Sequence, residues 1–174
     1  ASATITDKRG WGRFQGKLLL GKKKNGTQTA VGVIALYAPC PGGHTAQWQK
    51  EKLVEAREQT TDPNVKMIGD LRDAMAPHAH PDTYWILIGD TNCRLQQDEV
   101  TAVRKKHREE WLAFMSEFGL ETSEDPDTAT CYPTTGTPSH IDHAMVSTDL
   151  MDSSAYKGTH TINYFAKQGT AERM

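Results

Sequence analysis

The feature that most constrains the fold is a short apolar run at residues 84–88, Tyr-Trp-Ile-Leu-Ile, which stops at Gly89-Asp90-Thr91-Asn92. A nearly unbroken apolar run of this length, ended by turn-forming residues, is typical of a strand that is buried on both faces. Such a strand needs packed neighbours on both sides of its sheet. Helical patterns precede and follow the run, so the sequence predicts an α/β protein.

The remaining elements follow from hydrophobic periodicity and turn signals. Asn25-Gly26 predicts a hairpin turn, because both residues tolerate positive φ. Asp62 followed by Pro63 predicts the start of a helix. Strands are expected at residues 14–20, 30–37, 84–88, 129–132, 141–147 and 159–165, and helices at residues 45–59, at residues 63–75 and in the long polar segment that ends before Gly119.

Two of the expected helices carry apolar residues at helical spacing. In the first helix, Trp48, Leu53 and Ala56 fall on or near one face. The second helix carries a stripe that we interpret as core rather than as a cofactor surface: Met67, Ile68, Leu71 and Met75.

Length and composition predict one domain over residues 1–174, with a sizeable core and no membrane-spanning run. The formal net charge of −2 disfavours a passive DNA-binding module, which depends on Lys and Arg to neutralise phosphates. The run Lys22–Lys24 is either a phosphate-contacting patch or, as we favour, a solvated turn. Three widely spaced cysteines favour an intracellular, reducing compartment over a disulfide framework.

The end of the apolar strand is the sharpest candidate site. Loops beyond the carboxyl ends of strands hold ligand sites in α/β proteins. Asp90 and Asn92, two residues apart on an extended backbone, would point the same way. A carboxylate accepts a proton from water or binds a hard cation, and an amide orients a nucleophile or a phosphate oxygen. The alternative is a strand-ending turn, because Gly, Asp and Asn all favour turns.

Two further polar residues occupy strand ends. Asp142 starts an apolar strand, where it would fix the tautomer of a histidine or simply face solvent. Tyr37 ends a strand before Ala38-Pro39. There its hydroxyl would reach a phosphate, or its ring would pack against the protein with the hydroxyl exposed to solvent.

The ordered series Tyr-Ala-Pro, Ile-Gly-Asp-x-Asn and Ser-x-Ile-Asp-His, at intervals of about fifty residues, resembles the endonuclease/exonuclease/phosphatase superfamily. Gly12-Arg13-Phe14, Thr130 and the segment around Phe118-Gly119-Leu120 look like its non-LTR retrotransposon endonucleases. The resemblance covers about residues 12 to 147. It implies a four-layer α/β sandwich, in which two mainly antiparallel sheets are flanked by helices, and Mg²⁺-dependent hydrolysis of DNA phosphodiesters.

By position, the resemblance gives each site residue a role. Tyr37 resembles the phosphate-contacting tyrosine, Asp90 the acid that activates water, and Asn92 the amide that orients water or phosphate. Asp90 and Asn92 would be metal ligands, although weak ones. Asp142 resembles the partner of a catalytic histidine.

Two family elements have no match in the sequence. The principal metal-binding Glu should precede Tyr37, but the first Glu is Glu51, and a terminal Ser-Asp-His is absent. His160 fits an exposed strand position better than a catalytic one. We therefore expect a truncated domain, incomplete at both ends, that binds metal poorly and has little or no activity.

Other functions stay open. One alternative is a catalytically inactive remnant that acts as a folded module. Another is a phosphatase or lipid phosphodiesterase of the same superfamily, because fold-level analogy does not fix the substrate. A Zn²⁺ site at Cys40, Cys93 and nearby histidines lacks a Cys-x-x-Cys pair and is disfavoured. Cys93 is better interpreted as a small residue packed under the Asp-x-Asn turn. Nuclear action would follow only from the retroelement resemblance.

Overall fold

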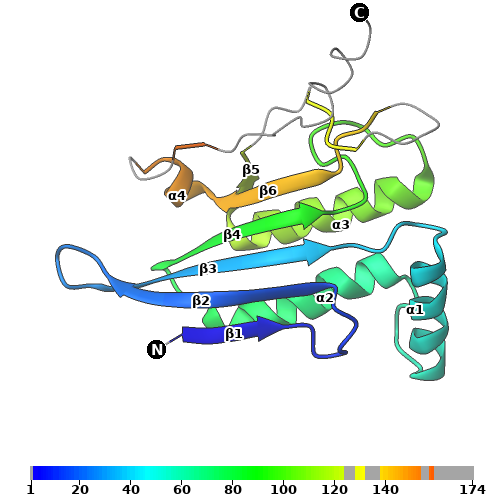
Figure 1. Cartoon of the computed structure of the whole chain (residues 1–174), viewed down its shortest axis with the longest axis horizontal. Helices are drawn as coiled ribbons and strands as arrows, with labels where there is room; N and C mark the ends of the chain where they lie inside the picture. Colours follow the sequence, from blue (N-terminus) through cyan, green and yellow to red (C-terminus); the bar gives the residue numbers. More distant parts are fainter. Residues whose placement is uncertain (1, 124–127, 132–137, 154–156, 159–174) are drawn as a thin grey trace, which may run out of the picture.

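The structure is a computed structural model, which describes residues 2–123, 128–131, 138–153 and 157–158. Its strands form one mixed sheet in the order β1-β2-β3-β4-β6-β5 (Figure 1). The strands are β1 (Ser2–Thr6), β2 (Phe14–Lys22), β3 (Gln28–Tyr37), β4 (Thr83–Asp90), β5 (Leu120–Thr122) and β6 (Asp142–Ser147). The helices are α1 (His44–Glu55), α2 (Pro63–Met75), the 3-10 turn η1 (Ala76–His78), α3 (Ala102–Phe118) and α4 (Thr148–Met151).

The sheet is antiparallel except at its centre, where β3 and β4 run parallel. A parallel neighbour requires a crossover connection, which α1 and α2 supply between β3 and β4. The α/β class and the mainly antiparallel pairing are as predicted. The strands of the described residues make this single sheet, so the second sheet of the expected sandwich is not found among them.

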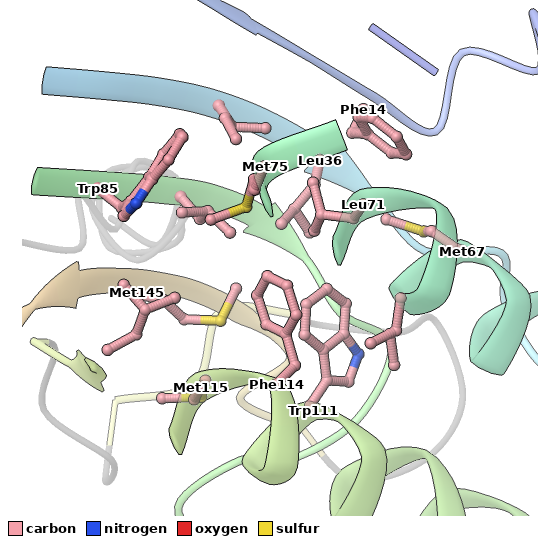
Figure 2. Close-up of a cluster of buried hydrophobic side chains, with 14 of the residues drawn as sticks. Phe14, Leu36, Met67, Leu71, Met75, Trp85, Trp111, Phe114, Met115 and Met145 are labelled. Atoms are coloured by element: carbon pink, nitrogen blue, oxygen red, sulfur yellow. The ribbon is translucent and has the colours of Figure 1, made fainter. Parts of the chain in front are cut away.

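The core lies between one face of the sheet and helices α2 and α3 (Figure 2). The methionine stripe of α2 is core as predicted, with Met67, Leu71 and Met75 fully buried. Across from it, α3 contributes Trp111 and Phe114, whose rings meet edge to face at 5.7 Å. Figure 2 shows these side chains meeting between the two helices and the strands.

Strand β3 alternates between the two faces of the sheet, with Ile34 and Leu36 buried and Val33 and Tyr37 exposed. In β4, the fully buried Leu87 alternates with Ile88, which is 51% exposed. The strand expected to be buried on both faces is therefore half exposed on the face away from the helices.

Helix ends follow from capping. The Asp62 carboxylate accepts hydrogen bonds from the backbone N–H groups of Asn64 and Val65, so α2 begins where the sequence predicted. The Thr101 side chain accepts from the N–H of Arg104 at the start of α3, and Gly119 ends α3 in the left-handed conformation.

Several sequence expectations were wrong or lie outside the described residues. Helix α1 ends four residues earlier than expected, and it buries Ala46, Gln49 and Leu53 while Trp48 and Ala56 are exposed. Of the strand expected at residues 129–132, the described part forms only an isolated bridge between Cys131 and Ser139. The strand expected at residues 159–165, with His160, lies outside the described residues.

Strands β1 and β5 were not expected. Strand β1 follows a weak pattern in which only Ile5 is buried, and β5 has three residues. Among the described residues, no helix combines the length and the apolar character that crossing a membrane would need.

The turn between β1 and β2 is fixed by buried ion pairs. The Arg13 side chain is 1% exposed and donates to both carboxylate oxygens of Asp7, at 2.8 and 2.7 Å. It also donates to Asp70 of α2 at 2.7 Å. Burial raises the pKa of Asp7, but the hydrogen bonds and charge of Arg13 more than offset this, so the pKa lies below its ordinary value.

Candidate active site at the carboxyl ends of β3 and β4

Three of the predicted site residues share one row across the centre of the sheet. Tyr37 at the end of β3 is in register with Asp90 at the end of β4, and Asp90 is in register with Asp142 at the start of β6. Residues in register on paired strands point to the same face, so the three side chains project together on the face away from α2 and α3. The sheet thus joins residues that are far apart in sequence.

The row combines an exposed hydroxyl with two half-buried carboxyls. Tyr37 is 53% exposed, and Asp90 and Asp142 are of intermediate exposure. Directly opposed residues of an antiparallel pair have Cβ atoms about 4.5–5.5 Å apart, so the two carboxyls are close neighbours.

A glycine lets the backbone of β4 reach this geometry. Gly89 has φ of +151°, and a Cβ atom there would lie 1.8 Å from the carbonyl oxygen of Leu36 on β3. Only glycine permits so close an approach of the two strands. The Gly of Gly-Asp-x-Asn is therefore needed for strand packing just before the site.

Burial raises the pKa of Asp90 from its ordinary 3.8 to about 6. A hydrogen bond from the backbone N–H of Asn92, at 2.6 Å, opposes this rise, while the charge of Asp142 adds to it. The nearby His143 and Arg104 lower the pKa again. A carboxyl that changes protonation near neutral pH is suited to accept a proton from water.

Asn92 departs from the expected geometry. Its φ is +52°, so the chain turns after Asp90 and the two side chains do not lie on one extended backbone. The Asn92 side chain is buried, and its Nδ2 donates to the carbonyl oxygen of Ala38 at 2.5 Å. Asn92 therefore ties the loop after β4 to the segment after β3, and its backbone N–H holds the Asp90 carboxylate.

Thr91 and Cys93, which flank Asn92 in the turn, are both buried. The Thr91 hydroxyl donates to the carbonyl oxygen of Cys93 at 2.9 Å, and its backbone N–H donates to that of Ile141 at 2.9 Å. Cys93 is fully buried, and this burial raises the pKa of its thiol to about 12. Cys93 therefore packs under the turn as predicted.

Two histidines near the row are not among the predicted site residues. His140 and His143 are buried and their rings stack at 4.8 Å. The Nε2 atom of His143 lies 3.0 Å from the carbonyl oxygen of Cys93. The sequence Ser-His-Ile-Asp-His could have indicated that both histidines lie near the site, because it places one histidine on each side of the Ile-Asp pair.

In the part of the chain that the structure describes, no group of three His, Cys, Asp or Glu side chains could hold a metal ion. Two carboxylates nevertheless suit Mg²⁺, which keeps several waters and binds proteins through one or two carboxylates. Asp90 and Asp142 fit that pattern, since the two residues are directly opposed across β4 and β6.

The lysine-rich turn lies at the other end of the sheet. It joins the end of β2 to the start of β3, whereas the row is at the end of β3 (Figure 1). Lys23 pairs with Asp82 at 2.6 Å. The run Lys22–Lys24 is therefore a surface turn and not part of this site.

No protein-family model matches the chain, and no curated protein matches it either. Among solved structures, the Xenopus laevis APE2 catalytic domain is 16% identical with a TM-score of 0.45, over 82% of this chain and 48% of that chain. The human Nocturnin catalytic domain with bound sulfate is 15% identical with a TM-score of 0.40, over 85% and 47%. An endonuclease/exonuclease/phosphatase from Beutenbergia cavernae DSM 12333 is 13% identical with a TM-score of 0.44, over 85% and 37%.

These likenesses are weak, with identities of 13–16% and TM-scores of 0.40–0.45. One of the three structures carries the name of the superfamily that the sequence motifs resemble. The chain spans less than half the length of each of these three structures. At these identities and TM-scores the likeness carries no information about substrate or activity.

Proposed function

We propose that the row Tyr37–Asp90–Asp142 belongs to the phosphodiester-hydrolysing site of a metal-dependent enzyme whose substrate is DNA. The observation that carries the proposal is the register of the row, which places a hydroxyl donor and two carboxyls from three strands on one sheet face. Phosphoryl transfer depends mainly on positioning and charge neutralisation, and this row offers groups for both.

Each residue has a step that suits its surroundings. Asp90, ionised above about pH 6, accepts a proton from the attacking water. The exposed Tyr37 hydroxyl donates a hydrogen bond to a non-bridging phosphate oxygen. Asn92 positions Asp90 through its backbone N–H. The Asp142 carboxylate stabilises the positive charge of a nearby protonated histidine or bound cation.

Mg²⁺ is the cofactor that the donor set fits, with Asp90 and Asp142 as the residues that would hold it. When bound, it supplies positive charge to the phosphate and to the leaving oxygen. The motif resemblance further supports a retroelement-type endonuclease acting in the nucleus, and both remain parts of the proposal.

The test is nicking of supercoiled plasmid with Mg²⁺, by the 174-residue chain and by any longer natural product of the same reading frame. Asp90→Asn should lower the nicking rate at least about 100-fold, the low end of what a general base contributes. Asp73→Asn, an exposed carboxylate on α2, is the matched control and should leave the rate unchanged. Equal nicking by Asp90→Asn and the parent would refute the role of Asp90.

A further inference from the structure

A pocket of about 450 Å³ lies among the helices, and none of the three residues of the candidate active-site row lines it. Its walls come from the segment after β3, from α1, and from the starts of α2 and α3. The apolar part of the wall includes Pro41, Ala46, Pro63 and Val103. Small-molecule sites are pockets of this size, mainly apolar with a few well-placed polar groups.

The polar side chains of the pocket divide between its mouth and its interior. Gln47 and Lys50 of α1 are exposed and therefore lie at the mouth. Asn64 and His107 are each 2% exposed, and Asp62 is half-buried, so these three form the polar part of the interior wall. A ligand that fills the pocket therefore meets the groups of Asp62, Asn64 and His107.

Asp62 and His107 form a fixed pair that joins α2 to α3. The Nε2 atom of His107 lies 3.0 Å from both carboxylate oxygens of Asp62. Burial raises the pKa of Asp62, but hydrogen bonds from His107 and from two backbone N–H groups outweigh it, so the pKa lies below its ordinary value. Asp62 is therefore a carboxylate at neutral pH, and it accepts the proton on Nε2. Nδ1 of the neutral ring is then an acceptor, and no described residue donates to it.

Asn64 adds a second acceptor without a partner. Its Nδ2 donates to the carbonyl oxygen of Pro39 at 2.9 Å, which fixes the orientation of the amide. Its Oδ1 is buried and accepts no hydrogen bond from the described part of the chain. Buried polar groups without partners are costly, so these acceptors would gain from a ligand that donates hydrogen bonds.

We propose that this pocket binds a small organic cation, which carries an ammonium, amidinium or guanidinium head on an apolar body. The head would donate to the Asp62 carboxylate and to Oδ1 of Asn64, and the body would pack against the apolar wall. An anionic head is disfavoured, because it would meet a carboxylate and neutral acceptors in the interior. The site is separate from the proposed catalytic row and does not depend on it.

The lysines near the pocket leave this preference intact. Nζ of Lys106 lies 3.8 Å from Oδ2 of Asp62, beyond hydrogen-bond distance, and the Lys106 side chain is 54% exposed. Lys50 is exposed at the mouth. Because water surrounds both ammonium groups, they repel a cationic head only weakly.

Three fragments with the same ring and different heads separate the possibilities: benzamidine, benzamide and benzoate. Each is titrated into the ¹⁵N-labelled chain at pH 7, and the backbone N–H shifts of the lining residues are followed by NMR. We expect benzamidine to saturate with a Kd of about 1–10 mM, the range for a fragment of nine heavy atoms. Benzamide should bind about 3- to 10-fold more weakly, because its hydrogen bonds lack the charge. Benzoate should not saturate.

Two variants and a control locate the binding. Val103 lines the pocket and is 52% exposed in the first turn of α3, so Val103→Trp fills the pocket and should weaken benzamidine binding at least about 10-fold. Val100→Trp is the matched control, since Val100 is 85% exposed and does not line the pocket, and it should bind like the parent. Asp62→Asn keeps a good helix cap but removes the charge, so it should weaken benzamidine binding more than benzamide binding.

The inference is overturned if benzoate binds as tightly as benzamidine, or if Val103→Trp binds benzamidine like the parent. It is also overturned if benzamidine gives no saturable shifts in the lining residues, or if Asp62→Asn weakens all three fragments equally. Plasmid nicking should be the same in Val103→Trp, Val100→Trp and the parent. Failure of fragment binding would therefore leave the proposed function untouched, and loss of nicking in Asp90→Asn would not bear on the pocket.

Discussion

Asp90 and Asp142 face each other directly across β4 and β6. Like charges opposed on neighbouring strands destabilise a sheet, and Asp90 is also half-buried. The folded protein thus holds an unfavourable arrangement of negative charge at its sheet centre. Strain of this kind is typical of functional sites, where a cation or a substrate relieves it.

The raised pKa of Asp90 predicts an unusual pH dependence of stability. Between about pH 4 and pH 6 the folded state holds the Asp90 proton that the unfolded state has released. The free energy of unfolding contributed by Asp90 therefore falls as pH rises through this window. Asp90→Asn removes the carboxylate and should be more stable than the parent at pH 7 by about 1–2 kcal/mol, discounted for partial exposure.

Urea denaturation at pH 4 and at pH 7 checks this prediction. The advantage of Asp90→Asn should shrink at pH 4, where Asp90 is protonated in the folded parent. Asp73→Asn should have no such pH-dependent difference. A variant less stable than the parent at pH 7 would contradict a pKa of Asp90 that burial raises in the folded state.

The Tyr37 hydroxyl is expected to act in catalysis and not in folding. Tyr37 is 53% exposed, so Tyr37→Phe should leave the melting temperature within about 1 °C of the parent. If the hydroxyl donates to a phosphate oxygen, nicking should fall about 10-fold, which corresponds to one hydrogen bond. Thermal melts and plasmid nicking on the same preparation separate the two effects.

Gly89 and Gly69 should respond oppositely to the same substitution. In Gly89→Ala the new Cβ would meet the Leu36 carbonyl oxygen, and we expect a loss of at least about 3 kcal/mol. Gly69 lies within α2, where a Cβ meets nothing within 4 Å, so Gly69→Ala should gain about 0.5–1 kcal/mol. Urea midpoints of both variants provide the measurement, and a tolerated Gly89→Ala would contradict the close approach of β3 and β4.

The buried ion pairs of the β1–β2 turn should be far more sensitive than surface pairs. Arg13→Met leaves Asp7 buried without its partner and should cost about 3–5 kcal/mol. Lys52→Met breaks an exposed pair with Glu55 and should change stability by less than about 0.5 kcal/mol. Chemical denaturation of the two variants, under identical buffer conditions, compares them, and equal losses would argue against the burial of Arg13.

The elements that could be predicted from sequence are those whose periodicity and end signals agree. The α2 stripe with its Asp62–Pro63 start and the alternating strand β3 are examples. The face of α1 could not be predicted in this way, because a helix that buries Gln49 and exposes Trp48 contradicts the hydrophobic pattern. Strand β1 pairs with β2 along its whole length but buries only Ile5, so its own apolar pattern is too weak to predict a strand.

The candidate site was predictable in part for a related reason. Tyr37, Asp90 and Asp142 each end or begin a strand, and strand ends can be located from local sequence. Their common row depends on the register of β3, β4 and β6, which local patterns do not fix. The side chain of Asn92 turns inward because its backbone has a positive φ. Asparagine tolerates a positive φ but does not require it, so the spacing of Asp90 and Asn92 alone wrongly predicted that the two side chains point the same way.

The parallel pairing of β3 with β4 also bears on the order of folding. The β2–β3 hairpin can form early, because its partners are close in sequence. Two hydrogen bonds connect the loop after β4 to the segments next to Tyr37 and Asp142. They join Asn92 to Ala38 and Thr91 to Ile141, which are 54 and 50 positions apart. Contacts at such separations have a high entropic cost of loop closure and form slowly. The row should therefore be among the last parts of the molecule to assemble, so a kinetic intermediate would have an intact hairpin before Tyr37 and Asp90 become neighbours.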